Sequence, residues 1–147
     1  IVLKKLILES KISGFNIIFK KIEKKKKNAL KNNLTIDFFE LNILTESIKK
    51  YDVIVSNPPY IANNEKKNMH TNVLDYEPHL ALFVDDSDPL LFYKKIALQI
   101  QNSDTVAYFE TSEFYTELLD KWMINEGFIT EWKNDLNGKT RFLKIMK

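Results

Sequence analysis

The sequence predicts an α/β three-layer sandwich, in which helices cover both faces of a mostly parallel sheet. Three observations lead to this fold class. Short apolar runs typical of strands alternate with longer runs typical of helices. The run YDVIVS at 51–56 is apolar on both faces, as expected of a parallel strand that helices cover on two sides. Only NDLNG separates the last two apolar runs, which predicts a closing antiparallel hairpin.

Strand and helix runs alternate through the first half of the chain. The expected helix at 19–33 carries the lysine run KKIEKKKK, which predicts a solvated helix face, with a nucleic-acid patch as the alternative. In order, we expect the end of a helix at 1–10, a strand at 11–18, a helix at 19–33, a strand at 35–41, a short helix or loop at 43–50 and a strand at 51–56.

The second half begins with a long loop and ends in the hairpin. Pro89 stands in the expected first turn of a helix, where its missing N–H is tolerated. Ser112 is placed to cap the next helix, and Gly127 is placed to end it. In order, we expect a loop at 57–72, a helix at 89–101, a strand at 104–110, a helix at 112–126 and strands at 128–133 and 140–146.

The composition limits the possible functions. The chain has 147 residues, the length of one domain, and its 44% of hydrophobic residues are enough for a folded core. Without Cys there is no disulfide or thiolate chemistry, and two His predict no metal site. A net charge of +2 indicates neither a nucleic-acid nor a membrane partner. No run is long enough to span a bilayer or to form a secretory signal. We therefore expect a cytoplasmic protein.

The motif Asn57-Pro58-Pro59-Tyr60 directly follows the strand at 51–56. Open α/β sheets bind their ligands at the carboxyl ends of strands. Each proline holds the residue before it in an extended conformation, so the loop backbone is stiff. The Asn57 side-chain oxygen and the Pro58 carbonyl can then accept the two hydrogens of a planar –NH2 group. Tyr60 offers a flat face beside that group.

This arrangement of acceptors suits methyl transfer to an amide or amino nitrogen. The lone pair of such a nitrogen is delocalised, which makes the nitrogen a poor nucleophile. Two fixed acceptors can twist it out of conjugation and stabilise the positive charge that grows as the methyl group arrives. The remaining work is alignment of the reacting atoms. The alternative is an Asn-Pro turn that merely ends a strand.

The chain resembles the release factor glutamine methyltransferases, an S-adenosylmethionine-dependent family. The resemblance rests on DVIVSNPPYI, on NVLDYEPHLALFVDDSDPLLFYKKI at 72–96 and on LNGKTRFLK near the end. It implies a Rossmann-like class I methyltransferase fold with a seven-stranded sheet. It also implies methylation of the glutamine in the Gly-Gly-Gln loop of peptide chain release factors, the proteins of translation termination. A monomer without direct nucleic-acid contact is expected.

The resemblance assigns roles to the residues of the Asn-Pro-Pro-Tyr loop. Asn57 and Pro58 would be catalytic and would hold the glutamine amide, and Pro59 and Tyr60 would complete the substrate pocket. Downstream, the resemblance implies that Glu77 and Pro78 shape the loop wall, with a helix-start or turn pair as the alternative, whereas His70 and His79 are expected to be packing or surface residues.

The sequence departs from the family at the cofactor site. The residues that the resemblance implies for cofactor binding are Asn16 at the ribose, Asn42 and Ile43 at the adenine, and Asn57. At Asn16 and Asn42 family members usually carry an acid, and an asparagine offers one acceptor oxygen where a carboxylate has two. Loss of a charge-assisted hydrogen bond costs about 1.5–3 kcal/mol.

Two family segments are not recognised in this chain: the N-terminal helical domain, and the first strand with the glycine-rich loop that wraps the cofactor. Gly14, Gly127 and Gly138 cannot form that loop. We therefore expect residues 1–147 to form a single partial catalytic domain with an incomplete sheet. Without the first strand, the strands at 11–18 and 51–56 either pair directly or keep open inner edges, and the chain alone is expected to be poorly stable.

Two other functions stay open at this point. The chain could belong to another amino methyltransferase that acts on a ribosomal protein glutamine or on a flipped DNA adenine. It could also be a non-catalytic truncated remnant, which the two asparagine substitutions and the missing loop favour.

Overall fold

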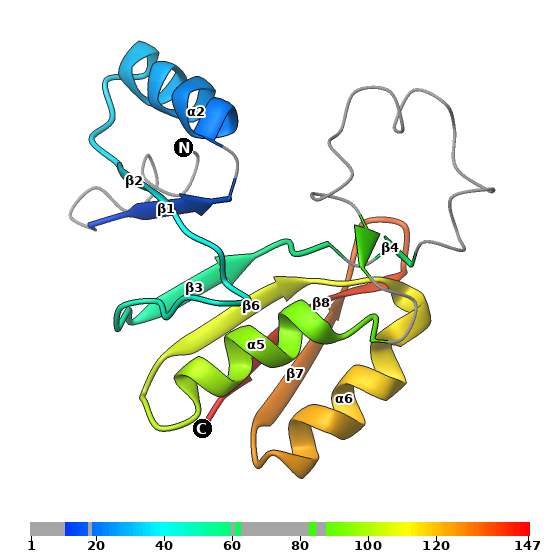
Figure 1. Cartoon of the computed structure of the whole chain (residues 1–147). Coiled ribbons are helices and arrows are strands. Elements are labelled where there is room, and N and C mark those ends of the chain that lie inside the picture. The colour runs from blue at the N-terminus through cyan, green and yellow to red at the C-terminus, as the bar shows by residue number, and fades with distance from the viewer. Residues whose placement is uncertain (1–10, 18, 60, 63–82, 85–87) are drawn as a thin grey trace. The chain divides into compact units, whose positions relative to one another are not determined.

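The computed structural model describes residues 11–17, 19–59, 61–62, 83–84 and 88–147. The chain divides into two compact units, Ile1–Glu46 and Ser47–Lys147. Strands and helices mix in both, so the predicted α/β class is confirmed (Figure 1). That residues 1–147 form one partial catalytic domain stays a prediction.

The first unit contains the predicted strand–helix–strand sequence. Strands β1 and β2 pair in parallel, with Ser13 opposite Asp37. The helix between them buries Ile22 and Ala29, while the lysines at 24–27 are exposed, as predicted for a solvated face. The elements are β1 (Ser13–Asn16), α2 (Phe19–Lys31) and β2 (Asp37–Glu40).

The second unit is built on a four-stranded sheet with the order β3-β6-β8-β7. The first pair is parallel and the other two pairs are antiparallel. In the turn between the last two strands, Asp135 Oδ1 accepts from the backbone N–H groups of Asn137 and Lys139, and Gly138 has a φ of 79°. This confirms the predicted closing hairpin. The strands are β3 (Val53–Ser56), β6 (Val106–Glu110), β7 (Ile129–Asn134) and β8 (Thr140–Met146).

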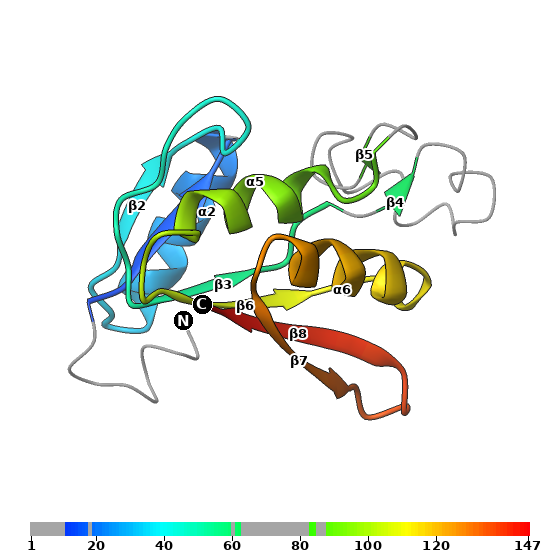
Figure 2. The same cartoon turned by 90° about the horizontal axis from the view of Figure 1, so that it is seen from below.

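Helices α5 (Leu91–Ile100) and α6 (Thr116–Asn125) lie on the same face of this sheet (Figures 1 and 2). The core forms between them and the sheet. Its fully buried side chains include Tyr93, Ala97, Ala107, Phe109, Leu119, Met123, Leu143 and Ile145.

The ends of the two helices agree with the sequence in part. As predicted, Ser112 acts as an N-cap: its Oγ accepts from Phe114 N at 3.3 Å, at the start of the 3₁₀ turn η2 (Glu113–Tyr115) that precedes α6. Gly127 has a φ of 80° just after α6, where it was expected to stop the helix. The expectation for Pro89 was wrong. It lies in the turn before α5, because Asp88 Oδ1 accepts from Leu90 N at 3.1 Å.

The opposite face of the four-stranded sheet carries exposed apolar and aromatic side chains. Val53 and Val55 of β3 are 54% and 60% exposed, and Tyr108 and Phe142 beside them are also exposed. The expectation that helices cover β3 on both faces is therefore not met in the described part of the chain. The physical reason is that both described helices of this unit return to the same side of the sheet.

One strand of a short pair, β4, lies within the predicted loop at 57–72. Strands β4 (Ile61–Ala62) and β5 (Phe83–Val84) form a separate parallel sheet of two strands. Among the described strands, β1 pairs with β2 within the first unit and β3 pairs with β6 within the second. Within the described residues, no helix has the length and apolar character needed to cross a membrane.

Candidate active site

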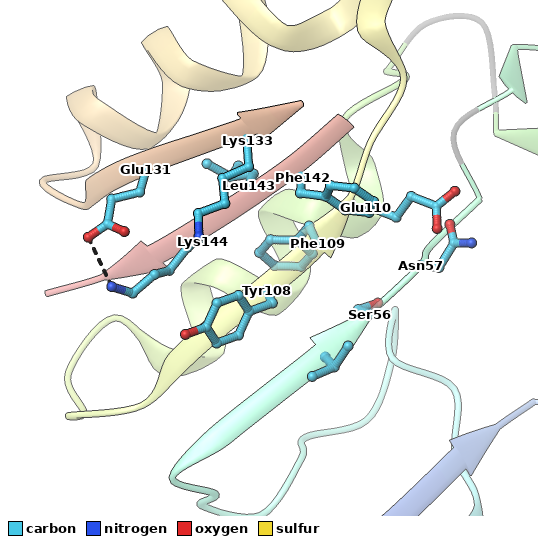
Figure 3. A pocket seen from close by; sticks show the side chains of 11 residues that line it. Ser56, Asn57, Tyr108, Phe109, Glu110, Glu131, Lys133, Phe142, Leu143 and Lys144 are labelled. Carbon is cyan, nitrogen blue, oxygen red and sulfur yellow. Dashed lines mark hydrogen bonds and ion pairs between the residues drawn. The ribbon is translucent and has the colours of Figure 1, made fainter. Parts of the chain in front are cut away.

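The Asn-Pro-Pro-Tyr motif begins where β3 ends. In the parallel pair β3–β6, Ser56 lies opposite Phe109, so Asn57 and Glu110 follow as the next residues of neighbouring strands. The carboxyl ends of parallel strands meet at one edge of a sheet, which is where open α/β folds bind ligands. Figure 3 shows the side chains of Asn57 and Glu110 next to each other at this edge.

The loop itself combines a buried anchor with an exposed amide. Pro58 is buried and Pro59 is half-buried, whereas Asn57 is exposed. A proline ring without freedom in φ and packed against the protein fixes the direction of the residue before it. The Asn57 amide is thus held on a stiff backbone while its polar atoms stay accessible. Tyr60, Glu77, Pro78, His70 and His79 lie outside the described residues.

A hollow of about 440 Å³ opens from this edge across the exposed face of the sheet. Its floor is apolar and aromatic, and its rim carries acids and lysines (Figure 3). A volume of this size accepts a side chain or a small molecule. The lining residues are Val55, Ser56, Asn57, Tyr108, Phe109, Glu110, Glu131, Lys133, Phe142, Leu143 and Lys144.

The far end of the hollow holds an ion pair. Lys144 Nζ lies 2.9 Å from Glu131 Oε1. The hydrogen bond that Lys144 donates to Glu131 raises the pKa of the lysine above its usual value. Desolvation lowers the pKa by less than this hydrogen bond raises it, and the negative charge of Glu131 raises it further. Both charges at this end are thus satisfied by each other.

Glu110 differs from the other acids of this sheet. Among the described residues, its carboxylate has no hydrogen-bond or ion-pair partner. The cation nearest to it in the strand register, Arg141, instead contacts Asp135 at 3.5 Å and Glu113 at 4.0 Å. Among the described residues, the Glu110 carboxylate at the edge beside Asn57 therefore has no cationic partner.

Of the residues predicted to hold the cofactor, Asn16, Asn42 and Ile43 lie in the first unit, whereas Asn57 lies in the second. Because β1 and β2 are parallel, their carboxyl ends lie at one edge, and the carbonyl of Asn16 accepts from Leu41 N at 3.2 Å. Asn16 and the loop that contains Asn42 and Ile43 are thus brought to the same edge. This placement fits a nucleoside ligand in the first unit.

One contact modifies the predicted role of Asn42. Its side-chain oxygen accepts from Leu44 N at 3.1 Å, and its backbone N–H donates to Glu46 Oε1 at 2.7 Å. The oxygen therefore stabilises its own loop and retains one lone pair for an outside donor. If Asn42 binds an adenine amino group, its side-chain oxygen must accept from that group and from Leu44 N at the same time.

Sequence reasoning missed Glu110 and Tyr108. The available signal was weak: an acid at the end of an apolar strand, with an aromatic residue two positions earlier. Their position beside the Asn-Pro-Pro-Tyr loop depends on the pairing of β3 with β6, which are far apart in the sequence.

Comparisons with known proteins identify the family of the chain. The family model described as Eco57I restriction-modification methylase matches residues 3–142. A release factor glutamine methyltransferase of Flavobacterium psychrophilum is 41% identical over 152 residues, which cover 97% of this chain and 52% of that protein. The enzyme of the same name from Bacteroides thetaiotaomicron is 42% identical over 97 residues, 63% of this chain and 35% of that protein. The chain thus spans about half the length of the Flavobacterium psychrophilum relative. Its match to the Bacteroides thetaiotaomicron relative covers a smaller share of that protein.

Solved structures support the fold. A ribosomal protein L11 methylase from Lactobacillus delbrueckii subsp. bulgaricus superimposes with a TM-score of 0.62 at 13% identity, over 94% of this chain and 58% of that one. The Pyrococcus abyssi tRNA (uracil-54, C5)-methyltransferase gives 0.54 at 11% identity, over 95% of this chain and 29% of that one. At such low identities these matches carry the fold alone, and they confirm the predicted Rossmann-like α/β fold.

Proposed function

From the membership of this chain in the family described as Eco57I restriction-modification methylase, we propose that it is part of a protein-glutamine methyltransferase that acts on peptide chain release factors. Its resemblance to the release factor glutamine methyltransferases is confirmed. The observation that carries the proposal is the exposed Asn57 amide on a loop anchored by the buried Pro58, at the carboxyl end of β3.

The cofactor of this reaction is S-adenosylmethionine, which supplies a methyl group on a positively charged sulfur. The residues present fit its nucleoside part: Asn16 would hold the ribose, and Asn42 and Ile43 would lie against the adenine. Their support is the shared carboxyl edge of β1 and β2 and the remaining lone pair of the Asn42 oxygen.

The substrate amide is held by the catalytic loop. The oxygen of Asn57 and the carbonyl of Pro58 accept the two hydrogens of the glutamine –NH2 group, and Pro59 and Tyr60 complete the pocket around it. These acceptors reduce the delocalisation of the nitrogen lone pair and orient it toward the methyl group. They also stabilise the positive charge that develops on nitrogen, an electrostatic effect that needs no rearrangement during the reaction.

A DNA adenine is the second candidate substrate. The exocyclic amine of a flipped adenine presents the same two hydrogens. The weak net charge of +2 favours a protein substrate instead, because DNA binding depends strongly on cationic contacts to phosphates.

A transfer assay separates these substrates. The chain is fused to the part of the Flavobacterium psychrophilum relative that it does not match, and the fusion receives S-adenosylmethionine with a labelled methyl group. We expect label on a release factor and none on the variant in which the Gly-Gly-Gln glutamine is replaced by Ala. Three results would contradict the proposed function: label on an adenine-containing duplex alone, label on a ribosomal protein alone, or no label on any substrate.

A further inference from the structure

The carboxylate of Glu110 faces the hollow beside the catalytic amide. Phe109 is 2% exposed and packs toward the helices, so the alternation of a strand places Glu110 and Tyr108 on the opposite, open face. Figure 3 shows the Glu110 carboxylate directed toward Asn57, at the end of the hollow where β3 and β6 terminate.

The backbone that carries this carboxylate is fixed from the other side of the sheet. The Tyr93 hydroxyl of α5 donates to the Glu110 carbonyl at 3.1 Å. Tyr93 is 1% exposed, and its ring packs edge-on against Phe109 with 5.5 Å between the ring centroids. Because the carbonyl is anchored in the core, the Glu110 side chain leaves the strand end from a defined position.

The charge of Glu110 distinguishes it from acids that only stabilise the sheet. Glu131 pairs with Lys144 at 2.9 Å, and Glu113 pairs with Lys139 at 2.6 Å. Glu110 has no such partner among the described residues. A half-buried carboxylate without a cation is suited to stabilise a positive charge brought by a ligand.

We propose that Glu110 is a catalytic residue that stabilises the positive charge on the substrate nitrogen and accepts the proton that this nitrogen must lose. The inference rests on the proposed function. Asn57 and Pro58 offer only neutral oxygens, which are too weakly basic to take a proton in neutral water. The Glu110 carboxylate, directly or through one water, supplies the base that the loop lacks.

The step balances in atoms and charge. The nitrogen lone pair forms a bond to the methyl carbon while the carbon–sulfur bond breaks and leaves its electron pair on sulfur. The nitrogen then carries a positive charge, the methyl group and two hydrogens. One N–H electron pair returns to nitrogen as the proton passes to Glu110, which leaves a neutral N-methyl amide. Glu110 then releases its proton to water.

Binding of a charged substrate analogue tests this role without catalysis. In a Gly-Gly-ornithine peptide, the ornithine ammonium occupies the place of the amide nitrogen in a Gly-Gly-Gln peptide. We expect the chain to bind the ornithine peptide more tightly than the glutamine peptide, and Glu110→Gln to reduce this preference about 10-fold, because a charge-assisted contact is lost. Dissociation constants from titration calorimetry give the ratio.

Glu131→Gln is the matched control, because it removes the same charge from the far end of the same hollow, where Glu131 is paired with Lys144. It should leave the preference for ornithine unchanged. A Glu110→Gln chain that keeps the full preference would overturn the proposal, as would a preference lost equally in both variants.

Turnover separates this inference from the proposed function. In the fusion with the Flavobacterium psychrophilum relative, Glu110→Gln should lower kcat about 100-fold, the usual scale of general base catalysis, with little change in KM for the release factor. A fusion that fails to methylate the release factor with Glu110 intact refutes the proposed function. A fusion that methylates equally well with Glu110→Gln refutes only the role of Glu110.

Discussion

Asp120 holds α6 against the terminal hairpin through one carboxylate oxygen. Its Oδ1 accepts from the Thr130 hydroxyl at 2.7 Å and from Trp132 Nε1 at 2.8 Å. Asp120→Ala would leave the half-buried indole N–H without a partner, so we expect the free energy of unfolding to fall by about 2–3 kcal/mol. Urea denaturation of the purified chain measures this loss.

Asp120→Asn is the control, because it keeps one oxygen at the same place. Its loss should stay below about 1 kcal/mol, the value of an ordinary neutral hydrogen bond. Equal losses for the two substitutions would mean that packing, and not the shared oxygen, joins the helix to the hairpin.

The residues of the site differ in how far the sequence could predict them. The sequence predicts the Asn-Pro-Pro-Tyr loop because its four residues are adjacent and carry their own stereochemistry. Glu110 was not found, because a single acid at the end of an apolar strand has no local pattern, and its neighbour Asn57 comes from a distant strand. The loop contact of Asn42 was also hidden, since an asparagine in a polar loop has many possible partners.

At the scale of elements, β8 presents two adjacent side chains to opposite faces. Leu143 is 1% exposed under the helices, and Phe142 is 44% exposed in the hollow. We expect Leu143→Ala to lower the free energy of unfolding by about 2–5 kcal/mol through lost burial and a cavity. Phe142→Ala, the matched control, should cost less than about 1 kcal/mol in the same denaturation experiment. Similar costs would show that both faces of the sheet are packed.

The elements themselves were predictable where local chemistry decides them. The hairpin strands follow from the turn residues between them, and the end of α6 follows from Gly127, whose φ of 80° favours a residue without a side chain. The exposure of Val53 and Val55 was not predictable. Their apolar pattern indicates a strand suited to burial on both sides, but not which face the described helices of this unit cover.

At the scale of the whole molecule, the two units differ in the size of their described cores. In the first unit only Ile22 and Ala29 are among the buried hydrophobic residues described, whereas the second unit buries the rest. Local stability follows buried apolar contact. We therefore expect amide hydrogens of α2 and β1 to exchange much faster than those of β6 and β8, as measured by hydrogen exchange with mass spectrometry.

The same experiment tests the expected poor stability of the chain. Uniform slow exchange through both units, together with one sharp cooperative melt, would contradict the picture of a sheet whose strands pair in separate groups. Slow exchange confined to the second unit would support it.

In the proposed function Asn57 holds the glutamine amide for methyl transfer, and the sharpest test of this role is mass spectrometry of a release factor after incubation with the fusion protein. With Asn57 intact, we predict one added methyl group on the glutamine of the Gly-Gly-Gln loop. With Asn57→Ala, we predict no methylation while the affinity for S-adenosylmethionine, measured by calorimetry, is retained. Methylation by Asn57→Ala at the unaltered rate would contradict the account.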